Sequence, residues 1–290
     1  MALLWEVPLV GAGGEPISFG RTVHSHGCAQ LPPADVVEDP LRYRRRLRFG
    51  ERVVALTMEA RGNRLAVESD LKLGPRDARK ARGFVAKMFR LQDDLAPFYA
   101  QIAGDERLGW VTAGAGRILA SPTVFEDVVK TICTTNCAWS ATIRMTTALV
   151  ELGGGAFPDA ALLARTPLKW YNDVARMGYR GPYVRTIAAE VVAGRLDLES
   201  FTQRERYDDE TIEELLLALP GVGPYAAAHI MQLLGRHRPL VLDSWTRPAY
   251  LRLSGRKRAV DRTIRRDFAR YGEYAGLAFW LFLTREWVED

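Results

Sequence analysis

The stretch from Leu215 to Ala228 decides the fold, and it reads Leu-Leu-Leu-Ala-Leu-Pro-Gly-Val-Gly-Pro-Tyr-Ala-Ala-Ala. The pattern predicts a helix that ends at Leu219, a break at Pro220, and a second helix that begins after Gly223. Glycines in such a break let the backbone turn tightly and approach a partner closely. The second helix presents free N–H groups at its start, which together with the helix dipole suit a phosphate. We therefore interpret residues 215–228 as a hairpin that grips a phosphate backbone without reading sequence.

A single carboxylate follows this hairpin. The segment Leu240-Val-Leu-Asp-Ser-Trp-Thr-Arg places Asp243 at the end of an apolar run. A lone Asp at such a place is usually a helix N-cap, but its pairing with the hairpin favours a functional role. Pro248 would lie inside the helix that Asp243 starts, where proline costs about 3 kcal/mol unless it falls in the first turn. We therefore expect this helix to begin late or to kink.

Outward from this stretch, the chain changes from a β-rich start to a helical body. Residues 51–60 and 63–69 alternate like strands around the turn signal at Gly62, which predicts a β-hairpin. After Pro75 the apolar spacing becomes helical. Helices are predicted at 78–95, 122–152 (a pair), 159–164, 168–176, 182–193 and 208–219, and the chain to residue 290 is expected to be mostly helical. The fold class is thus mainly α with a small α+β N-terminal domain.

Composition narrows the class of protein. The 290 residues carry 40 Lys and Arg against 35 Asp and Glu, a net charge of +5 that permits a polyanionic partner without proving one. No apolar run is long enough to cross a bilayer, and the N-terminus lacks the basic start of a signal peptide. The cations crowd one stretch, which is either a solvated face or a binding surface. They are Arg236, Arg238, Arg247, Arg252, Arg256, Lys257, Arg258, Arg262, Arg265 and Arg266.

Cysteine usage points to a reducing compartment. There are three cysteines, Cys28, Cys133 and Cys137, an odd count that does not suit a disulfide scaffold. Cys133 and Cys137 are spaced to share a helix face and could ligate a metal, but burial as small apolar side chains is the better interpretation. The sequence has no four-cysteine cluster, so we expect no iron–sulfur cluster.

At these residues the chain resembles the helix-hairpin-helix (HhH-GPD) superfamily of DNA glycosylases, nearest the alkyladenine (AlkA-type) and 8-oxoguanine branches. The resemblance extends over nearly the whole chain and is strongest from Ser121 to Thr246. It implies a β-containing domain at 1–75, a helical subdomain from 76–118 plus 246–290, and a helical barrel subdomain at 119–245. The two helical subdomains would flank an active-site cleft, with Asp243 as the essential catalytic carboxylate and Gly221 and Gly223 on the phosphate.

Three further segments match the superfamily. Ile132-Cys-Thr-Thr-Asn-Cys and Met177-Gly-Tyr-Arg-Gly-Pro-Tyr resemble segments of the 8-oxoguanine branch. The resemblance implies that Asn136 fills the gap left by a flipped nucleotide, that Tyr179 wedges beside the estranged base, and that Arg180 contacts that base. Helix capping by Asn136 and simple packing of Tyr179 are the alternatives. The carbonyls of Leu217, Leu219 and Val222 fall where relatives hold a monovalent cation, Na⁺ or K⁺.

Some residues of this chain differ from the pattern of the family, and the differences bear on the reaction type and on the substrate. Bifunctional relatives have a Lys where this chain has Tyr225, and a phenol cannot form their Schiff base, which implies a monofunctional enzyme. Ala141 replaces an Arg that the 8-oxoguanine branch directs at the opposite cytosine, and Phe279 replaces its lesion-reading Gln. An aromatic base pocket would follow, which suits enlarged or cationic purines. Its expected members are Tyr225, His229, Trp245 and Phe279, with His229 also a candidate hydrogen donor to the leaving base. Core packing is the alternative for Trp245, Phe279 and His229.

These implications combine into one expectation: a cytoplasmic, nucleoid-associated monomer that flips an alkylated or etheno-type purine out of double-stranded DNA and hydrolyses its glycosidic bond. No cofactor would be required beyond the cation at the hairpin, and no membrane would be involved. Two alternatives stay open. One is a glycosylase for another lesion, such as 8-oxoguanine, a mismatched adenine or a uracil-type base. The other is a non-catalytic damage-binding protein of the same fold.

Overall fold

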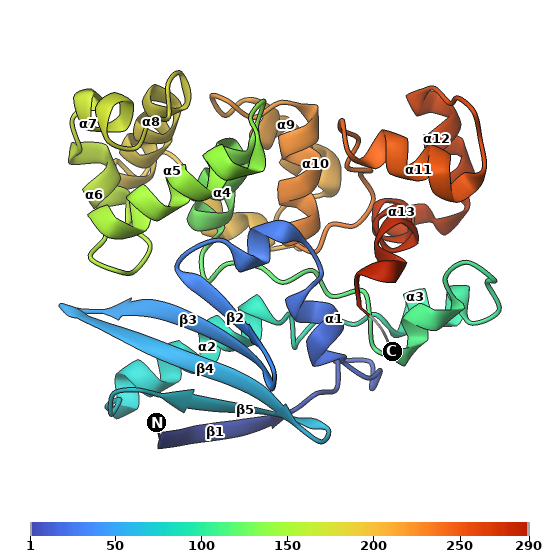
Figure 1. Cartoon of the computed structure of the whole chain (residues 1–290), viewed down its shortest axis with the longest axis horizontal. Helices are drawn as coiled ribbons and strands as arrows, with labels where there is room; N and C mark the ends of the chain where they lie inside the picture. Colours follow the sequence, from blue (N-terminus) through green and yellow to red (C-terminus); the bar gives the residue numbers. More distant parts are fainter. Residues whose placement is uncertain (1, 289–290) are drawn as a thin grey trace.

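The computed structural model describes residues 2–288 and places a small sheet beneath a large helical body (Figure 1). The strands are β1 (Ala2–Pro8), β2 (Ala34–Glu38), β3 (Leu41–Phe49), β4 (Arg52–Arg61) and β5 (Arg64–Ser69). The α-helices are α1 (Phe19–Val23), α2 (Pro75–Met88), α3 (Ala96–Ile102), α4 (Val124–Thr134), α5 (Trp139–Leu152), α6 (Ala160–Arg165), α7 (Leu168–Asp173), α8 (Arg180–Val192), α9 (Asp209–Leu217), α10 (Pro224–Leu233), α11 (Thr246–Ser254), α12 (Asp261–Phe268) and α13 (Ala275–Thr284). Short 3₁₀ helices are η1 (Gly27–Gln30), η2 (Gly109–Ala113), η3 (Leu198–Thr202), η4 (Ala269–Tyr274) and η5 (Arg285–Trp287).

The sheet is antiparallel throughout, in the order β1-β5-β4-β3-β2. The predicted hairpin is confirmed as β4 and β5, with Arg61 paired to Arg64 across a turn in which Gly62 takes a φ of +60°. The other three strands were not predicted one by one. In β3 arginines alternate with the inward-facing residues Tyr43, Arg45 and Leu47, which are buried, and Arg45 is paired there with Glu126. That period of two is a strand signal masked by the high charge of the segment.

Helix α2 packs on this sheet. Ala81, Val85 and Met88 join a core with strand residues such as Leu56 and Val67. The sequence grouped this helix with the C-terminal helices and extended it to residue 95. It ends at Met88, and only a short connection separates it from β5, so the nearest apolar surface it can cover is the sheet.

Two further cores divide the helical body. The apolar faces of α4 to α10 enclose one, and α3, η2 and α11 to α13 enclose the other. In Figure 1 they form the upper left and the right of the molecule. The predicted class, mainly α with a small N-terminal sheet, is confirmed. Within residues 2–288 no helix combines the length and apolarity that a membrane span requires.

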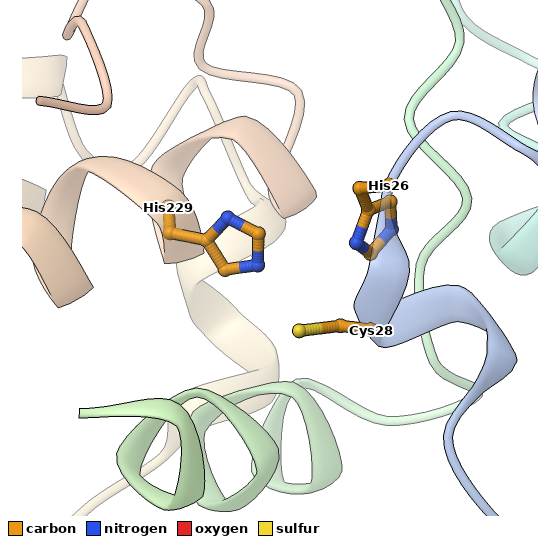
Figure 2. A group of neighbouring side chains, drawn as sticks. All are labelled: His26, Cys28 and His229. Carbon is orange, nitrogen blue, oxygen red and sulfur yellow. The ribbon is translucent and has the colours of Figure 1, made fainter. Parts of the chain in front are cut away.

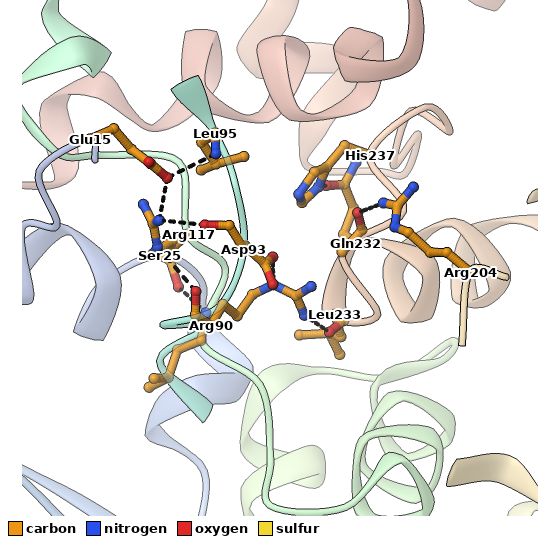
Figure 3. Close-up of polar contacts among 12 residues, drawn as sticks. Glu15, Ser25, Arg90, Asp93, Leu95, Arg117, Arg204, Gln232, Leu233 and His237 are labelled. Atoms are coloured by element: carbon orange, nitrogen blue, oxygen red, sulfur yellow. Dashed lines mark hydrogen bonds and ion pairs between the residues drawn. The ribbon is translucent and has the colours of Figure 1, made fainter. Parts of the chain in front are cut away.

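A buried ion pair and a partly buried one connect segments that are distant in the sequence, as Figure 3 shows. Arg117 donates to Glu15 at 2.5 Å and to the carbonyl of Asp93 at 3.0 Å. Arg90 pairs with Asp93 at 2.5 Å and donates to the carbonyl of Leu233 at 2.6 Å. Leu233 is the last residue of α10, so the N-terminal part of the chain holds the end of the second hairpin helix.

Candidate functional site

The predicted hairpin forms from α9, a tight turn and α10. Gly221 takes a φ of +84°, and a Cβ there would lie 2.6 Å from the ring of Tyr183, so no other residue fits without strain. Gly223 is the N-cap of α10, is exposed, and has open space around its Cα. The N–H groups of the first turn of α10 have no acceptor within the helix. The turn can therefore receive an anion such as phosphate at its open side.

The residues expected to fill a gap in DNA lie in a continuous row beside this turn. Asn136 has a φ of +46°, and its amide donates to the hydroxyl of Tyr179 at 3.4 Å. Tyr179 is 49 % exposed, and its ring centroid lies 5.8 Å from that of Tyr183, which in turn packs on Gly221. Segments more than 80 residues apart in sequence thus present one surface of polar and aromatic groups.

Arg180 does not lie where the family resemblance put it. Its side chain is buried and its guanidinium donates to the carbonyls of Thr135 and Asn136, the latter at 3.2 Å. It also packs 4.5 Å from the ring centroid of Tyr179. A guanidinium committed to backbone carbonyls is not free to contact an estranged base, so in this conformation Arg180 positions Asn136 and Tyr179.

Asp243 lies at the end of the connection between α10 and α11, and it is half-buried. Its Oδ1 accepts the N–H groups of Trp245 at 2.8 Å and Thr246 at 2.6 Å, while Thr246 Oγ1 accepts the N–H of Asp243 at 2.8 Å. Among the described residues no hydrogen bond engages Oδ2. Asp243 thus closes the turn that leads into α11, whose N-cap is Trp245, and this turn leaves the second carboxylate oxygen available.

This geometry removes the difficulty that Pro248 raised. Helix α11 begins at Thr246, so Pro248 is its third residue. A proline in the first turn lacks only an N–H that would have had no partner in the helix. The helix begins late, as one of the two expectations had it.

The connection that carries Asp243 is held by buried hydrogen bonds. Gln232 donates to the carbonyl of Pro239 at 3.0 Å, and the Nδ1–H of His237 donates to Gln232 at 3.0 Å. Arg236, expected in a cationic surface, is instead buried, pairs with Asp209 at 2.6 Å and donates to the carbonyl of Tyr207 at 2.8 Å. Its role is to fix the chain between the hairpin and Asp243.

Tyr225 and His229 stand one turn apart on α10, with ring centroids 6.3 Å apart and planes 17° from parallel. The Tyr225 hydroxyl lies 3.3 Å from Thr134 Oγ1. Burial raises the pKa of Tyr225 to about 12, and the charges of Cys28 and Asp243 make smaller contributions in the same direction. Burial lowers the pKa of His229 to about 4. Its imidazole is therefore neutral near pH 7 and can give a hydrogen bond, but it does not hold the extra proton of an acid.

Two predicted pocket residues lie elsewhere. Phe279 is fully buried in the C-terminal core, 5.2 Å from the ring of Phe268. It points inward because α13 is apolar on almost every face and is surrounded by α11, α12 and η4. Trp245 is 41 % exposed and packs against Trp280 and Trp287 at 5.7 Å and 5.4 Å. The aromatic that α13 offers next to Trp245 is therefore residue 280, one position after the predicted one.

Sequence reasoning missed a second wall of the site. His26 and Cys28 reach from η1 toward His229, with the two imidazole centroids 5.5 Å apart (Figure 2). Burial lowers the pKa of His26 to about 3 and raises that of Cys28 to about 12. The run His24-Ser-His-Gly-Cys28 was a visible signal, but its partner is about 200 residues away. Trp139 was missed as well; its exposed ring packs over Gly27.

Some of the Arg and Lys residues between positions 236 and 266 form ion pairs, and others are exposed without one. Arg238, Arg247 and Arg256 form ion pairs with Glu210, Asp261 and Asp267. Apart from the buried Arg236, the other members are exposed and make no ion pair within the described part of the chain. They lie on α11, on α12 and in the connection between these helices: Arg252, Lys257, Arg258, Arg262, Arg265 and Arg266.

The hairpin carbonyls are compatible with a monovalent cation. Leu219 accepts the N–H of Val222 at 3.1 Å, and a carbonyl oxygen keeps a second lone pair for a ligand. Leu217 ends α9, where helix carbonyls lack donors within the helix.

Solved structures of other proteins resemble this chain, although no family model matches its sequence. Neither a family model nor a curated protein matches the sequence. Among solved structures, a 3-methyladenine DNA glycosylase from Archaeoglobus fulgidus is similar at a TM-score of 0.73 and 20% identity, over 98% of this chain and 100% of the other. An 8-oxoguanine glycosylase/lyase from Clostridium acetobutylicum, in complex with DNA containing cytosine opposite 8-oxoguanine, reaches 0.69 at 21% identity, over 94% and 93%. A DNA-3-methyladenine glycosidase from Bacillus halodurans gives 0.52 at 24% identity, over 66% and 89%.

The first two structures match nearly the whole chain, sheet and helices together, while the third covers two thirds of it. At this level of identity the similarity establishes architecture. The chain has the fold of the helix-hairpin-helix DNA glycosylases, as the sequence resemblance predicted.

Proposed function

We propose that this protein is a monofunctional DNA glycosylase that hydrolyses the bond between a damaged base and its sugar. The single observation that carries the proposal is the position of Asp243. Its Oδ1 is fixed by two backbone N–H groups, no hydrogen bond within residues 2–288 engages Oδ2, and the connection that carries it is tied to the hairpin helix through Gln232 and Pro239. A purely structural role for Asp243 would not explain why this carboxylate follows a turn that is open to a phosphate.

Binding to double-stranded DNA would use the row from Asn136 to Gly221. The target base must leave the stack before its sugar bond can be attacked. Asn136 and Tyr179 would fill the gap, with Arg180 holding them from behind. The open turn at Gly221 and Gly223 would bind a phosphate, with a monovalent cation on the nearby carbonyls. The exposed cations of α11 and α12 would add sequence-independent attraction.

The chemistry would depend on charge. As the glycosidic bond stretches, positive charge grows on the sugar, and a fixed carboxylate stabilises it electrostatically. The Oδ2 atom of Asp243 would also orient or deprotonate the attacking water. The products are a free base and an abasic site, and the atoms of one water molecule account for both new bonds.

The side chain of Tyr225 supports the monofunctional assignment. A lyase of this class needs an amine that attacks the sugar and forms a Schiff base. Tyr225 is a neutral phenol, with its pKa raised to about 12 by burial, and it cannot form an imine. Borohydride should therefore trap no covalent complex between the protein and lesion-bearing DNA. A trapped complex on a denaturing gel would refute this part of the proposal.

The substrate class follows from the aromatic wall. Tyr225 and His229 are stacked on one another and form a flat, mostly apolar surface, which suits enlarged or cationic purines. We propose an alkylated or etheno-type purine as the target. An excision assay with a panel of lesions and opposite bases identifies it; preference for 8-oxoguanine, mismatched adenine or uracil would replace this assignment.

Replacing Asp243 tests the function directly. Asn keeps the shape and is itself a good N-cap, so Asp243→Asn should fold, bind lesion-bearing duplex, and lose at least about 100-fold in single-turnover excision. The matched control is Asp159→Asn, the same change at the N-cap of α6, where Asp159 accepts the N–H of Leu162 at 2.7 Å. Equal excision rates in the two variants would show that Asp243 is not the catalytic carboxylate. A wild-type protein that binds lesions without cutting would favour the damage-binding alternative.

A further inference from the structure

Three side chains with metal-ligating atoms meet between η1 and α10. They are His26, Cys28 and His229, and their ligand atoms all lie within 4.8 Å of one another. Figure 2 shows the thiol of Cys28 and the two imidazoles pointing into the same space. His26 and His229 are buried, and Cys28 is half-buried.

Two ring nitrogens that face this space have no hydrogen-bond partner among the described residues. The Nε2 atom of His26 lies 2.6 Å from the carbonyl of Leu119. A carbonyl can only accept, so Nε2 carries the proton and Nδ1 carries a lone pair. That Nδ1 atom and Nε2 of His229 are both buried without a hydrogen-bond partner among the described residues. Buried polar atoms are nearly always paired, and two unpaired nitrogens that face one thiol favour a ligand that all three can contact.

The size of the space limits what that species is. Three atoms within 4.8 Å of one another enclose room for a single atom, and a nucleobase cannot lie between them. The ligands of a tetrahedral zinc ion, with bonds of about 2.0–2.3 Å, lie about 3.3–3.8 Å apart. Small rotations of the three side chains would reach that geometry without any movement of the backbone.

The donor set selects the ion. Two imidazoles and one thiolate suit Zn²⁺, whereas Mg²⁺ and Ca²⁺ prefer oxygen ligands. The hydrogen bond from His26 to Leu119 is the kind of outer contact that orients a ligating histidine. The nearest buried cation, Lys130, is already paired with Glu126 at 2.7 Å, which reduces its repulsion of a metal ion.

We propose that His26 Nδ1, Cys28 Sγ and His229 Nε2 bind one Zn²⁺ ion, with a water molecule in the fourth position. On binding, the thiol proton of Cys28 is lost to solvent and a thiolate–zinc bond forms, without any change of oxidation state. The ion would tie η1, which packs with the sheet, to the helix that carries Tyr225. The proposal is independent of the glycosylase assignment, because its test uses no DNA.

The test uses the full chain without a histidine tag, freed of metal by a chelator, and Co²⁺ as a spectroscopic probe. One equivalent should produce the intense visible bands of tetrahedral cobalt and a thiolate-to-cobalt charge-transfer band. Zn²⁺ should then displace the cobalt in a one-to-one titration. X-ray absorption of the zinc form should report two nitrogen neighbours and one sulfur neighbour. Zinc should also raise the melting temperature, since it binds the folded state.

Variants locate the site. Cys28→Ser and His229→Gln should each weaken zinc binding by at least about tenfold and abolish the shift in melting temperature, and Cys28→Ser should remove the charge-transfer band. His24→Gln and Cys137→Ser are the matched controls, because both residues lie outside the cluster; they should bind as the wild type does. Circular dichroism checks that each variant is folded.

Several results would overturn the proposal. They are the absence of stoichiometric binding, an octahedral cobalt spectrum without the charge-transfer band, or unchanged binding in Cys28→Ser. X-ray absorption on the wild type decides the matter even if the variants fail to fold. A coordination shell without sulfur would mean that the zinc is bound elsewhere and that these three side chains do not hold it.

Discussion

The two ends of α10 differ in how they are built. At its start, Gly223 is exposed with open space around it, and the first-turn N–H groups have no partner in the helix. At its end, Arg90 holds Leu233, Gln232 holds Pro239, and Arg236 is buried against Asp209. The open end suits any phosphate, because backbone N–H groups and a helix dipole do not depend on distant residues. We call the end of α10 with these three contacts the locked end. The locked end determines where Asp243 lies, and its contacts come from segments far apart in the chain.

The largest effect should come from breaking the locked end. Arg236→Met removes a buried cation and leaves Asp209 and the carbonyl of Tyr207 without their donor, which should cost about 3–5 kcal/mol of unfolding free energy. The neighbouring Arg238 forms an exposed pair with Glu210, so Arg238→Met should cost less than about 1 kcal/mol. Urea denaturation of both variants measures the difference, and similar losses would show that the locked end is not special.

A smaller effect is expected at the open end. Gly221→Ala places a Cβ against the ring of Tyr183 at a φ of +84° and should cost about 1–3 kcal/mol of stability, with weaker DNA binding. Gly223→Ala meets open space at a φ of −101° and should change stability by less than about 1 kcal/mol. Fluorescence anisotropy with undamaged duplex and thermal unfolding measure the two quantities. Equal losses of stability and DNA affinity in Gly221→Ala and Gly223→Ala would contradict the difference in space around the two glycines.

The smallest expected effect concerns pH. Burial first, and then the charges of Arg90, Arg204 and Arg117, hold the pKa of His237 well below its ordinary 6.5. The unfolded chain therefore takes up a proton as the pH falls through 6.5 while the folded chain does not, and stability is lost on the acid side. His237→Asn, which can still donate to Gln232, should lose less stability than the wild type between pH 7.5 and pH 5. Parallel curves would show that His237 does not carry this dependence.

Local patterns predicted what depends on neighbours in sequence. The hairpin around Gly221, the β4–β5 pair and the helices from residue 122 to 219 follow from glycine positions and apolar spacing. Errors arose where packing between distant segments decides. Phe279 was assigned to a pocket because the position alone cannot tell which face of an apolar helix is covered. Arg180 was expected to contact DNA and Arg236 to lie on an exposed cationic face, because a charge in the sequence does not reveal whether distant carbonyls accept its hydrogen bonds.

The sequence by itself determined the class of fold, the tight turn at Gly221 and Gly223 and the carboxylate that follows it, because each depends on a few adjacent residues and their backbone preferences. Only the tertiary structure decided which arginines are buried, that Trp280 and not Phe279 approaches Trp245, and that His26 and Cys28 face His229. Those outcomes depend on how three separate cores pack together. Side chains some 200 residues apart meet only when the chain closes on itself, and no local pattern records that closure.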